Sequence, residues 1–313
     1  MNYSGVQGWR GAARRLTQIP GVLGQIAKEI RRSDFVLLRS PAHLGLLGAV
    51  LVRAMRFSSI TKWAGDNHTH PGEGIPNRLD RALQNVPDDR HPVLVYGPSE
   101  NRHQVSFIPA LMTREELAHA REISLRKRWS PPWRFISVGR LEPGKGIDLA
   151  LRGLAELKRR RPELPWLYTV IGDGSKRAAL EALAVDCGIR DRVIFPGRLS
   201  FREVGDRYAE SHAVIMPSTN EGWPKVIAEG WAHGAIPVAA PARLVEWILR
   251  EEGSGFLFAA EPEALATVLE SVLGDPARMR MISEALYPRA EQISLEQFKM
   301  QLERVLVERC GLR

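Results

Sequence analysis

Short apolar runs alternate with amphipathic segments through the second half of the chain. Strands are predicted at residues 135–138, 167–171, 193–195, 213–216, 235–239 and 255–258, and the main helices at about 147–161, 175–187, 201–210, 242–252 and 262–273. Short apolar strands that alternate with helices are typical of a parallel sheet covered on both faces. Residues 131–294 therefore read as one α/β domain.

The first 130 residues show the same alternation of strands and helices, but with fewer recognisable elements. Strands are predicted near 35–38, 59–62 and 93–96, and helices near 21–32, 42–56 and 113–127. Adjacent prolines at 131 and 132 interrupt regular structure and mark the boundary with the second domain. Apolar residues recur at helical spacing in the last segment, residues 295–313, which predicts an amphipathic helix that packs against a neighbour. The fold class is α/β with two parallel-sheet domains, the first one small.

The net charge of +8 belongs entirely to the front of the chain. Residues 1–130 contain 19 Lys and Arg against 11 Asp and Glu, whereas residues 131–313 contain 25 of each. Such a basic region can be a solvated face, or it can meet an anionic membrane surface or a phosphorylated substrate. Nucleic acid is not expected as a partner, because no binding motif accompanies the charge.

Hydropathy and cysteine content suggest the compartment. The longest strongly apolar run, residues 44–52, is far shorter than a membrane-spanning helix, and no secretory signal is found. The two cysteines, Cys187 and Cys310, lie far apart and lack metal-ligand spacing. We expect a cytoplasmic protein, with peripheral association at the inner face of the membrane as an option that the basic front region leaves open.

The segment EGWPKVIAE, residues 221–229, combines a loop with the start of a helix between two predicted strands. Pro224 suits a helix start, and the free N–H groups there can bind an anion such as phosphate. Glu221 and Glu229 lie eight positions apart and return to roughly one face of the helix. Since carboxylates do not hold phosphate, they are better explained as acceptors for sugar or ribose hydroxyls.

Three further loops follow predicted strands. The first, GRLEPGKG (139–146), carries Arg140 and Lys145, two cations suited to a diphosphate. The second, IGDGSKR (171–177), lacks the third glycine of a dinucleotide fingerprint, so a tight turn at Gly172 that lines a nucleotide crevice is preferred. The third, PGRLS (196–200), contains Arg198 and reads either as a base-contacting loop or as a structural turn.

Metal chemistry has little support in the sequence. No D-x-D triplet occurs, and the only cluster of possible ligands lies between residues 62 and 70. There Asp66, His68 and His70, near Lys62, could bind a metal, line an acceptor site or form an ordinary polar loop. We predict no metal and no cofactor, with a nucleotide-diphosphate sugar as co-substrate.

The motifs GRLEPGKG, VIGDG, FPGR and MPSTNEGWPKVIAEGWAHGAIPVAA, in this order over about residues 133–275, resemble the donor-binding half of the retaining glycosyltransferases of family 4. These are group 1 glycosyl transferases with the GT-B fold, in which two Rossmann-like domains face a cleft. The resemblance implies a metal-independent retaining enzyme that moves a sugar from a nucleotide sugar to a glycan or lipid-linked acceptor, in surface polysaccharide or glycoconjugate synthesis.

The resemblance also implies roles for individual residues. Arg140 and Lys145 would bind the donor diphosphate, Glu221 would contact the transferred sugar, and Glu229 would hold the ribose hydroxyls. Backbone of the loop after the strand at 135–138, with that around the helix start, would line the sugar and phosphates. This backbone belongs to Gly139, Gly222, Trp223, Pro224 and Lys225. The C-terminal helix would cross back to the front domain.

The front of the chain departs from this family's pattern. Members usually begin with a strand that runs into a glycine-rich loop, whereas residues 1–9 contain no such strand, so the first domain is expected to be reduced or to begin upstream. Arg39 stands where the family often has a histidine near the sugar. Two other readings therefore stay open: a donor-binding pseudoenzyme or regulatory subunit, and a sugar-nucleotide epimerase of the same fold.

Overall fold

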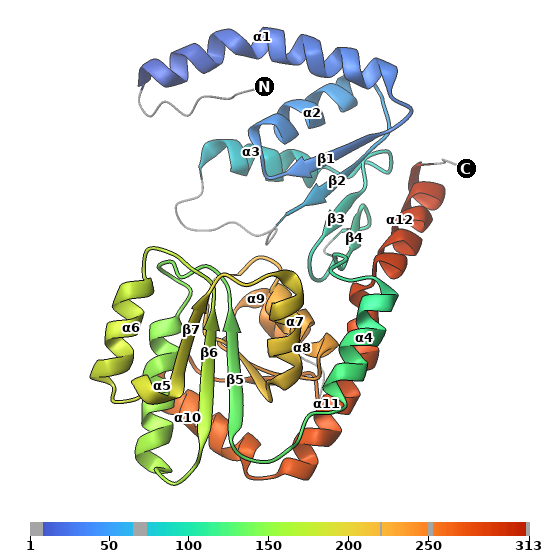
Figure 1. Ribbon diagram of the computed structural model, residues 1–313. Coiled ribbons are helices and arrows are strands. Elements are labelled where there is room, and N and C mark those ends of the chain that lie inside the picture. The colour runs from blue at the N-terminus through green and yellow to red at the C-terminus, as the bar shows by residue number, and fades with distance from the viewer. Residues whose placement is uncertain (1–8, 65–73, 100, 220, 250–252, 311–313) are drawn as a thin grey trace. The chain divides into compact units, whose positions relative to one another are not determined.

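The structure is a computed structural model that describes residues 9–64, 74–99, 101–219, 221–249 and 253–310, with the backbone alone for residues 9–17. The chain forms two compact units (Figure 1). One contains residues 1–107 with 302–313, and the other contains residues 108–301.

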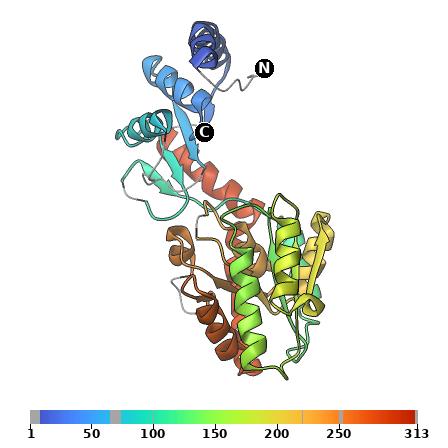
Figure 2. The same ribbon diagram turned by 90° about the vertical axis from the view of Figure 1, so that its left-hand side faces the viewer.

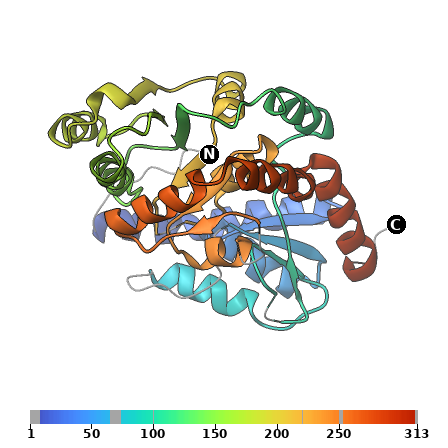
Figure 3. The same cartoon turned by 90° about the horizontal axis from the view of Figure 1, so that it is seen from below.

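The first unit is built on a four-stranded parallel sheet with the order β1-β2-β3-β4. Its strands are β1 (Val36–Ser40), β2 (Ser59–Trp63), β3 (Val93–Val95) and β4 (Gln104–Ser106), and its helices are α1 (Trp9–Arg32), α2 (His43–Ala54) and α3 (Ile75–Gln84). Ile30, Leu38, Ala49 and Val52 form a small core that joins α1, β1 and α2. In Figure 3, α3 (cyan) runs along this sheet. The sequence did not predict α3 or β4.

The second unit contains a six-stranded parallel sheet with the order β10-β9-β8-β5-β6-β7. Its strands are β5 (Trp133–Val138), β6 (Trp166–Ile171), β7 (Val193–Gly197), β8 (Ala213–Met216), β9 (Ile236–Ala239) and β10 (Phe256–Leu257). The chain builds outward from β5 through β6 to β7, then crosses to the other side of β5 and continues from β8. The strand order therefore reverses between β5 and β8, where open α/β sheets bind ligands at the carboxyl ends.

Helices cover both faces of this sheet, as the alternating pattern predicted. The helices after β4 are α4 (Arg114–Ser124), α5 (Ile147–Arg160), α6 (Arg177–Asp186), α7 (Phe201–Glu210), α8 (Lys225–Ala232), α9 (Arg243–Ile248), α10 (Pro262–Leu273), α11 (Pro276–Ala290) and α12 (Leu295–Cys310), with 3-10 turns at Arg190–Arg192 and Glu291–Ile293. Helix α12 passes from the second unit into the first at Leu302. Helix α5 buries Leu151, Leu154 and Leu157 and packs on α10. Figure 2 shows α5 and α6 in front of the sheet.

The division between the units falls after Phe107, whereas the sequence boundary lies at residue 130. Helix α4 accounts for the difference, because it packs on α7 and α8 and so belongs to the second unit. Its capping box, in which Thr113 and Glu116 exchange hydrogen bonds, fixes its start. The last residues, from Leu302 onward, belong to the first unit. Helix α11 was not predicted, because its sequence lacks a strong apolar stripe.

Candidate active site

Three loops meet at the carboxyl ends of β5, β6 and β8. Gly172 has φ +135°, and a Cβ there would collide with the carbonyl oxygen of Gly139. Gly146 has φ +69°, and a Cβ there would collide with the carbonyl of Pro217. Both positions need glycine, because the backbone is left-handed and the neighbouring loop touches it. Glycine at positions 146 and 172 therefore allows the three loops to pack closely against one another.

Hydrogen bonds tie the first two loops to each other. Leu141 donates its N–H to the carbonyl of Asp173 at 3.0 Å, and Lys176 donates to the carbonyl of Leu141 at 2.9 Å. The Ser175 hydroxyl donates to Glu142 Oε2 at 2.6 Å. The hydroxyl and the backbone N–H of Ser175 both donate to Glu142 and lower the pKa of its carboxyl, since they favour the carboxylate form. The loop that carries Arg140 and Lys145 is thus braced from one side.

A pocket of about 210 Å³ opens between the loop after β5 and the loop before α8. Polar and charged residues from both loops line it: Arg140, Lys145, Ser218, Glu221 and Lys225. Three further residues of the predicted donor site also line this pocket: Gly139, Trp223 and Pro224. The structure thus brings together side chains that lie about eighty positions apart in the sequence.

Lys145 and Glu221 form an ion pair inside this pocket. Lys145 Nζ donates to Glu221 Oε1 at 2.6 Å, with side chains 31% and 18% exposed. Both residues were predicted to face the donor, one at the diphosphate and one at the sugar. In this structure each neutralises the other, so a bound diphosphate would compete with Glu221 for the ammonium group.

The start of α8 borders the same pocket. Pro224 is the N-cap and Lys225 the first helical residue, so Pro224 precedes the first helical position by one. The pocket wall includes Trp223, Pro224, Lys225 and Val226. A helix start offers unpaired N–H groups and a partial positive charge, both suited to an anion.

Glu229 lies one turn further along α8 and lines a different cavity. Its Oε2 accepts a hydrogen bond from the Tyr208 hydroxyl at 2.9 Å. Burial raises the pKa of Glu229, and the bond from Tyr208 and the charge of Lys225 oppose that rise. Burial also raises the pKa of Tyr208 well above its usual value, so its phenol stays protonated and donates.

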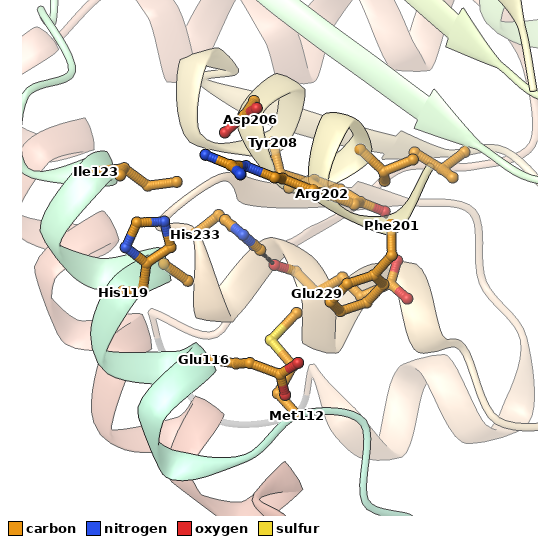
Figure 4. Close-up of a pocket in the computed structure, with 14 residues that line it drawn as sticks. Met112, Glu116, His119, Ile123, Phe201, Arg202, Asp206, Tyr208, Glu229 and His233 are labelled. Atoms are coloured by element: carbon orange, nitrogen blue, oxygen red, sulfur yellow. Dashed lines mark hydrogen bonds between the residues drawn. The ribbon is translucent and has the colours of Figure 1, made fainter. Parts of the chain in front are cut away.

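The cavity beside Glu229 has a volume of about 610 Å³ and is bounded by α4, α7 and α8 (Figure 4). Its polar lining consists of Glu116, His119, Arg202, Asp206, Tyr208, Glu229 and His233, and its apolar lining includes Met112, Ile123, Phe201 and Val204. Val138, at the end of β5, lines this cavity and the pocket of Lys145 as well. The two cavities therefore adjoin at the end of the central strand.

Sequence reasoning missed the residues of α4 and α7 in this cavity. Tyr208 lies in an amphipathic helix that reads as packing, and it is 1% exposed. Its polar contact depends on Glu229, 21 positions away, which no local pattern reveals. His233 was predicted to pack, and it is buried, with its ring stacked on Tyr208 at a centroid distance of 5.6 Å.

Other predicted residues lie outside both cavities or in the first unit. Gly172 and Gly222 line neither cavity, and Arg198 is exposed after β7. In the first unit, Arg39 of β1 and Lys62 of β2 are register partners on neighbouring strands. Asp66, His68 and His70 fall outside the described residues.

None of the helices in the described ranges is long and apolar enough to span a bilayer. Within the same ranges, no group of three or more His, Cys, Asp or Glu side chains is placed to hold a metal ion.

Comparison with known proteins identifies the family. The family model for glycosyl transferases group 1 matches residues 122–287, just over half of the chain, so the chain belongs to this family. That membership is what the motifs around Lys145 and Glu229 predicted.

Two curated relatives match parts of the chain. The alpha-D-kanosaminyltransferase of Streptomyces kanamyceticus is 27% identical over 241 residues, which is 75% of this chain and 60% of the relative. The D-inositol 3-phosphate glycosyltransferase of Xylanimonas cellulosilytica is 34% identical over 148 residues, 46% of this chain and 34% of the relative. The chain thus spans less than two thirds of either relative.

Solved structures confirm the fold class. HepE of Anabaena, crystallised with UDP, superposes with a TM-score of 0.72 at 18% identity, over 90% of this chain and 81% of HepE. Sucrose-phosphate synthase from Thermosynechococcus elongatus gives 0.71 at 18% identity, over 92% of this chain and 77% of the synthase. The predicted α/β class with two parallel-sheet domains, the GT-B fold, is confirmed.

Proposed function

We propose that this protein is a glycosyltransferase that takes a sugar from a nucleoside diphosphate sugar, with retention and without a metal ion. The observation that carries the proposal is the convergence of Arg140, Lys145, Glu221 and the start of α8 on one pocket, at the point where the strand order reverses. Cations and a helix start suit a diphosphate, and a carboxylate beside them suits sugar hydroxyls.

The diphosphate would lie between Arg140, Lys145 and the first turn of α8. As the bond between sugar and phosphate breaks, negative charge grows on the leaving diphosphate, and these groups stabilise it. The leaving group itself would take the acceptor proton during front-face attack, so no strong protein base is required. In this proposal Arg140 and Lys145 take the part that a divalent ion plays in other enzymes, so no metal ion is required.

The nucleoside would extend past Val138 toward Glu229. Val138 lines both cavities, and α8 carries Lys225 at one and Glu229 at the other. Glu229 would accept hydrogen bonds from the ribose hydroxyls, as its position in the family's motif implies. UDP is present in the solved structure of HepE, which supports a nucleotide as the donor's leaving group.

The acceptor is proposed to be a glycan or a lipid-linked glycan of surface polysaccharide or glycoconjugate synthesis. The excess positive charge of residues 1–130 supports a phosphorylated or membrane-bound acceptor, because basic residues near an anionic surface each contribute about 1 kcal/mol. We place the protein in the cytoplasm, with peripheral binding to the inner face of the membrane.

A binding screen of the purified protein against UDP-, GDP- and ADP-sugars tests the donor. We expect one of them to bind, and Arg140→Ala and Lys145→Ala to weaken both its binding and its turnover. Full turnover by both variants would refute the proposed clamp. Binding without transfer or hydrolysis would favour a donor-binding pseudoenzyme, and conversion of the sugar without an acceptor would favour an epimerase.

A further inference from the structure

The hydroxyl of Tyr208 donates a hydrogen bond to one oxygen of the Glu229 carboxylate. It donates to Glu229 Oε2 at 2.9 Å, and no other donor contacts this carboxylate in the hydrogen bonds found for the described side chains. Both side chains line the cavity, but Tyr208 is only 1% exposed, whereas Glu229 is partly exposed (Figure 4). One carboxylate oxygen is therefore held from within the protein, and the other is left for a ligand.

The ring of Tyr208 is itself fixed in place. It stacks on the His233 ring with an angle of 19° between the planes, and His233 Nδ1 donates to the backbone carbonyl of Glu229 at 2.8 Å. Gly205, one turn before Tyr208 on α7, leaves room for the imidazole, since a Cβ there would lie 3.3 Å from His233 Nε2. Tyr208 of α7 thus contacts α8 through two side chains: it bonds Glu229 and stacks on His233, the C-cap of that helix.

We propose that Tyr208 is a positioning residue for donor binding, which holds Glu229 so that its second oxygen meets the ribose of the nucleotide. This inference rests on the proposed function, because it assigns the ligand of Glu229 as a ribose. A hydrogen bond to a charged group contributes enough to change affinity about tenfold or more when it is lost. Tyr208 touches no ligand itself; it acts through the carboxylate.

The bond also favours the ionised form of Glu229, against the burial that raises the pKa of this carboxyl. Lys225 on its own helix, Tyr208 and Asp206 on α7, and Glu116 and His119 on α4 surround it. Arg202 and His233 complete the charged and titratable lining of the cavity. Loss of the phenol donor removes a contact that favours the carboxylate, so the pKa of Glu229 would rise further.

The test compares Tyr208→Phe with wild type in calorimetric binding of UDP, GDP and ADP, followed by the 2′-deoxy and 3′-deoxy forms of the one that binds. The variant keeps the ring that stacks on His233, so we expect it to fold. Tyr208→Phe should bind the ribonucleotide about tenfold more weakly than the wild type does. At least one deoxy form lacks the hydroxyl that Glu229 contacts, so its affinity should differ less than about twofold between variant and wild type. Ribonucleotide affinity should fall on acidification as Glu229 becomes protonated, and this fall, the acid limb of the pH profile, should lie at higher pH in the variant.

Tyr287→Phe is the matched control, because it removes another largely buried phenol whose hydroxyl bonds serines in the same unit. It should alter neither the deoxy discrimination nor the pH profile. Equal losses for the ribonucleotide and both deoxy forms, or an unchanged acid limb, would make Tyr208 merely structural and overturn the inference. Failure of the wild type to bind any of the three nucleotides would instead overturn the proposed function, and this inference with it.

Discussion

Lys145 Nζ lies 2.6 Å from Glu221 Oε1, so the cation and the carboxylate at the predicted donor site are bonded to each other. The pair is partly buried, and it joins the loop after β5 to the loop before α8. A diphosphate that binds Lys145 must replace this carboxylate or share the ammonium group with it. Glu221 would then be released toward the sugar as the donor enters.

Substitutions of the two partners should therefore have opposite effects on the affinity for a nucleoside diphosphate. Glu221→Gln removes the competing charge and should tighten binding of the free nucleoside diphosphate about threefold, while slowing sugar transfer. Lys145→Met should weaken the same binding about tenfold or more, because a charge-assisted contact to phosphate is lost. Isothermal titration with UDP and GDP measures both effects.

Lys158→Met is a close control for Lys145→Met. Lys158 is also paired with a carboxylate, that of Asp191, and its side chain is 32% exposed against 31% for Lys145. Because Lys158 lies on α5 away from the pocket lining, its loss should leave nucleotide binding unchanged.

Weaker nucleotide binding by Glu221→Gln would contradict the competition between Glu221 and the diphosphate.

Gly172→Ala should destabilise the second unit and disrupt the donor pocket. The added Cβ would collide with the Gly139 carbonyl while the backbone holds φ +135°, so the loss in unfolding free energy should be about 3 kcal/mol. Urea unfolding measures this loss, and titration with a nucleoside diphosphate measures the damage to the pocket.

Gly188→Ala separates backbone strain from collision. Gly188 has φ +66°, but a Cβ there would meet nothing within 4 Å. This variant should lose only about 1–2 kcal/mol and should bind nucleotide as the wild type does. If both variants lost equal stability, contact between the loops would not be the reason for glycine at position 172.

Two buried histidines should make the protein less stable in mild acid. Burial lowers the pKa of His212 and of His233 to about 4, while an unfolded histidine titrates near 6.5. The unfolded chain then binds more protons between these values, so stability is fully present above about pH 6.5 and falls as the pH drops toward 4. Each histidine can contribute up to about 1.4 kcal/mol per pH unit.

Urea unfolding at intervals between pH 4 and pH 8 would measure this slope. His212 Nδ1 accepts the backbone N–H of Arg134 at 2.9 Å, so protonation there breaks a hydrogen bond. His212→Asn should flatten the slope, whereas His43→Asn, at an exposed position, should leave it unchanged. An equal slope in wild type and His212→Asn would show that His212 does not carry the acid sensitivity.

The membrane proposal predicts a dependence on lipid charge. Lys28, Arg31 and Arg32 are exposed at the end of α1, and their replacement by glutamine should weaken binding to anionic vesicles by about 3 kcal/mol, or about a hundredfold. Flotation with phosphatidylglycerol vesicles measures this, with phosphatidylcholine vesicles as reference. Arg278→Gln with Arg280→Gln, on exposed positions of α11, should have no effect. Indifference of the wild type to lipid charge would remove the membrane from the proposal.

Most of the fold of the second unit could be predicted from the sequence. The strands there are short and mostly apolar, β8 and β9 are buried at every position, and helices α5, α7 and α10 begin and end within a residue of the prediction. Helices α3 and α11 and strand β4 were missed. Strand β4 is only three residues long, and α11 has apolar and charged residues mixed around its surface, so local pattern gives little signal for either.

The sequence alone indicated the loops that border the pocket, because charge and glycine at the ends of apolar strands are local features. It indicated Arg140, Lys145, Glu221 and Glu229 as residues of one ligand site. Only the tertiary structure decided how they are paired. Glu221 bonds Lys145 from a loop 76 positions away, and Glu229 bonds Tyr208 from the next helix. Those pairings depend on strand order and helix packing, which bring distant side chains within hydrogen-bonding distance and which no local spacing encodes.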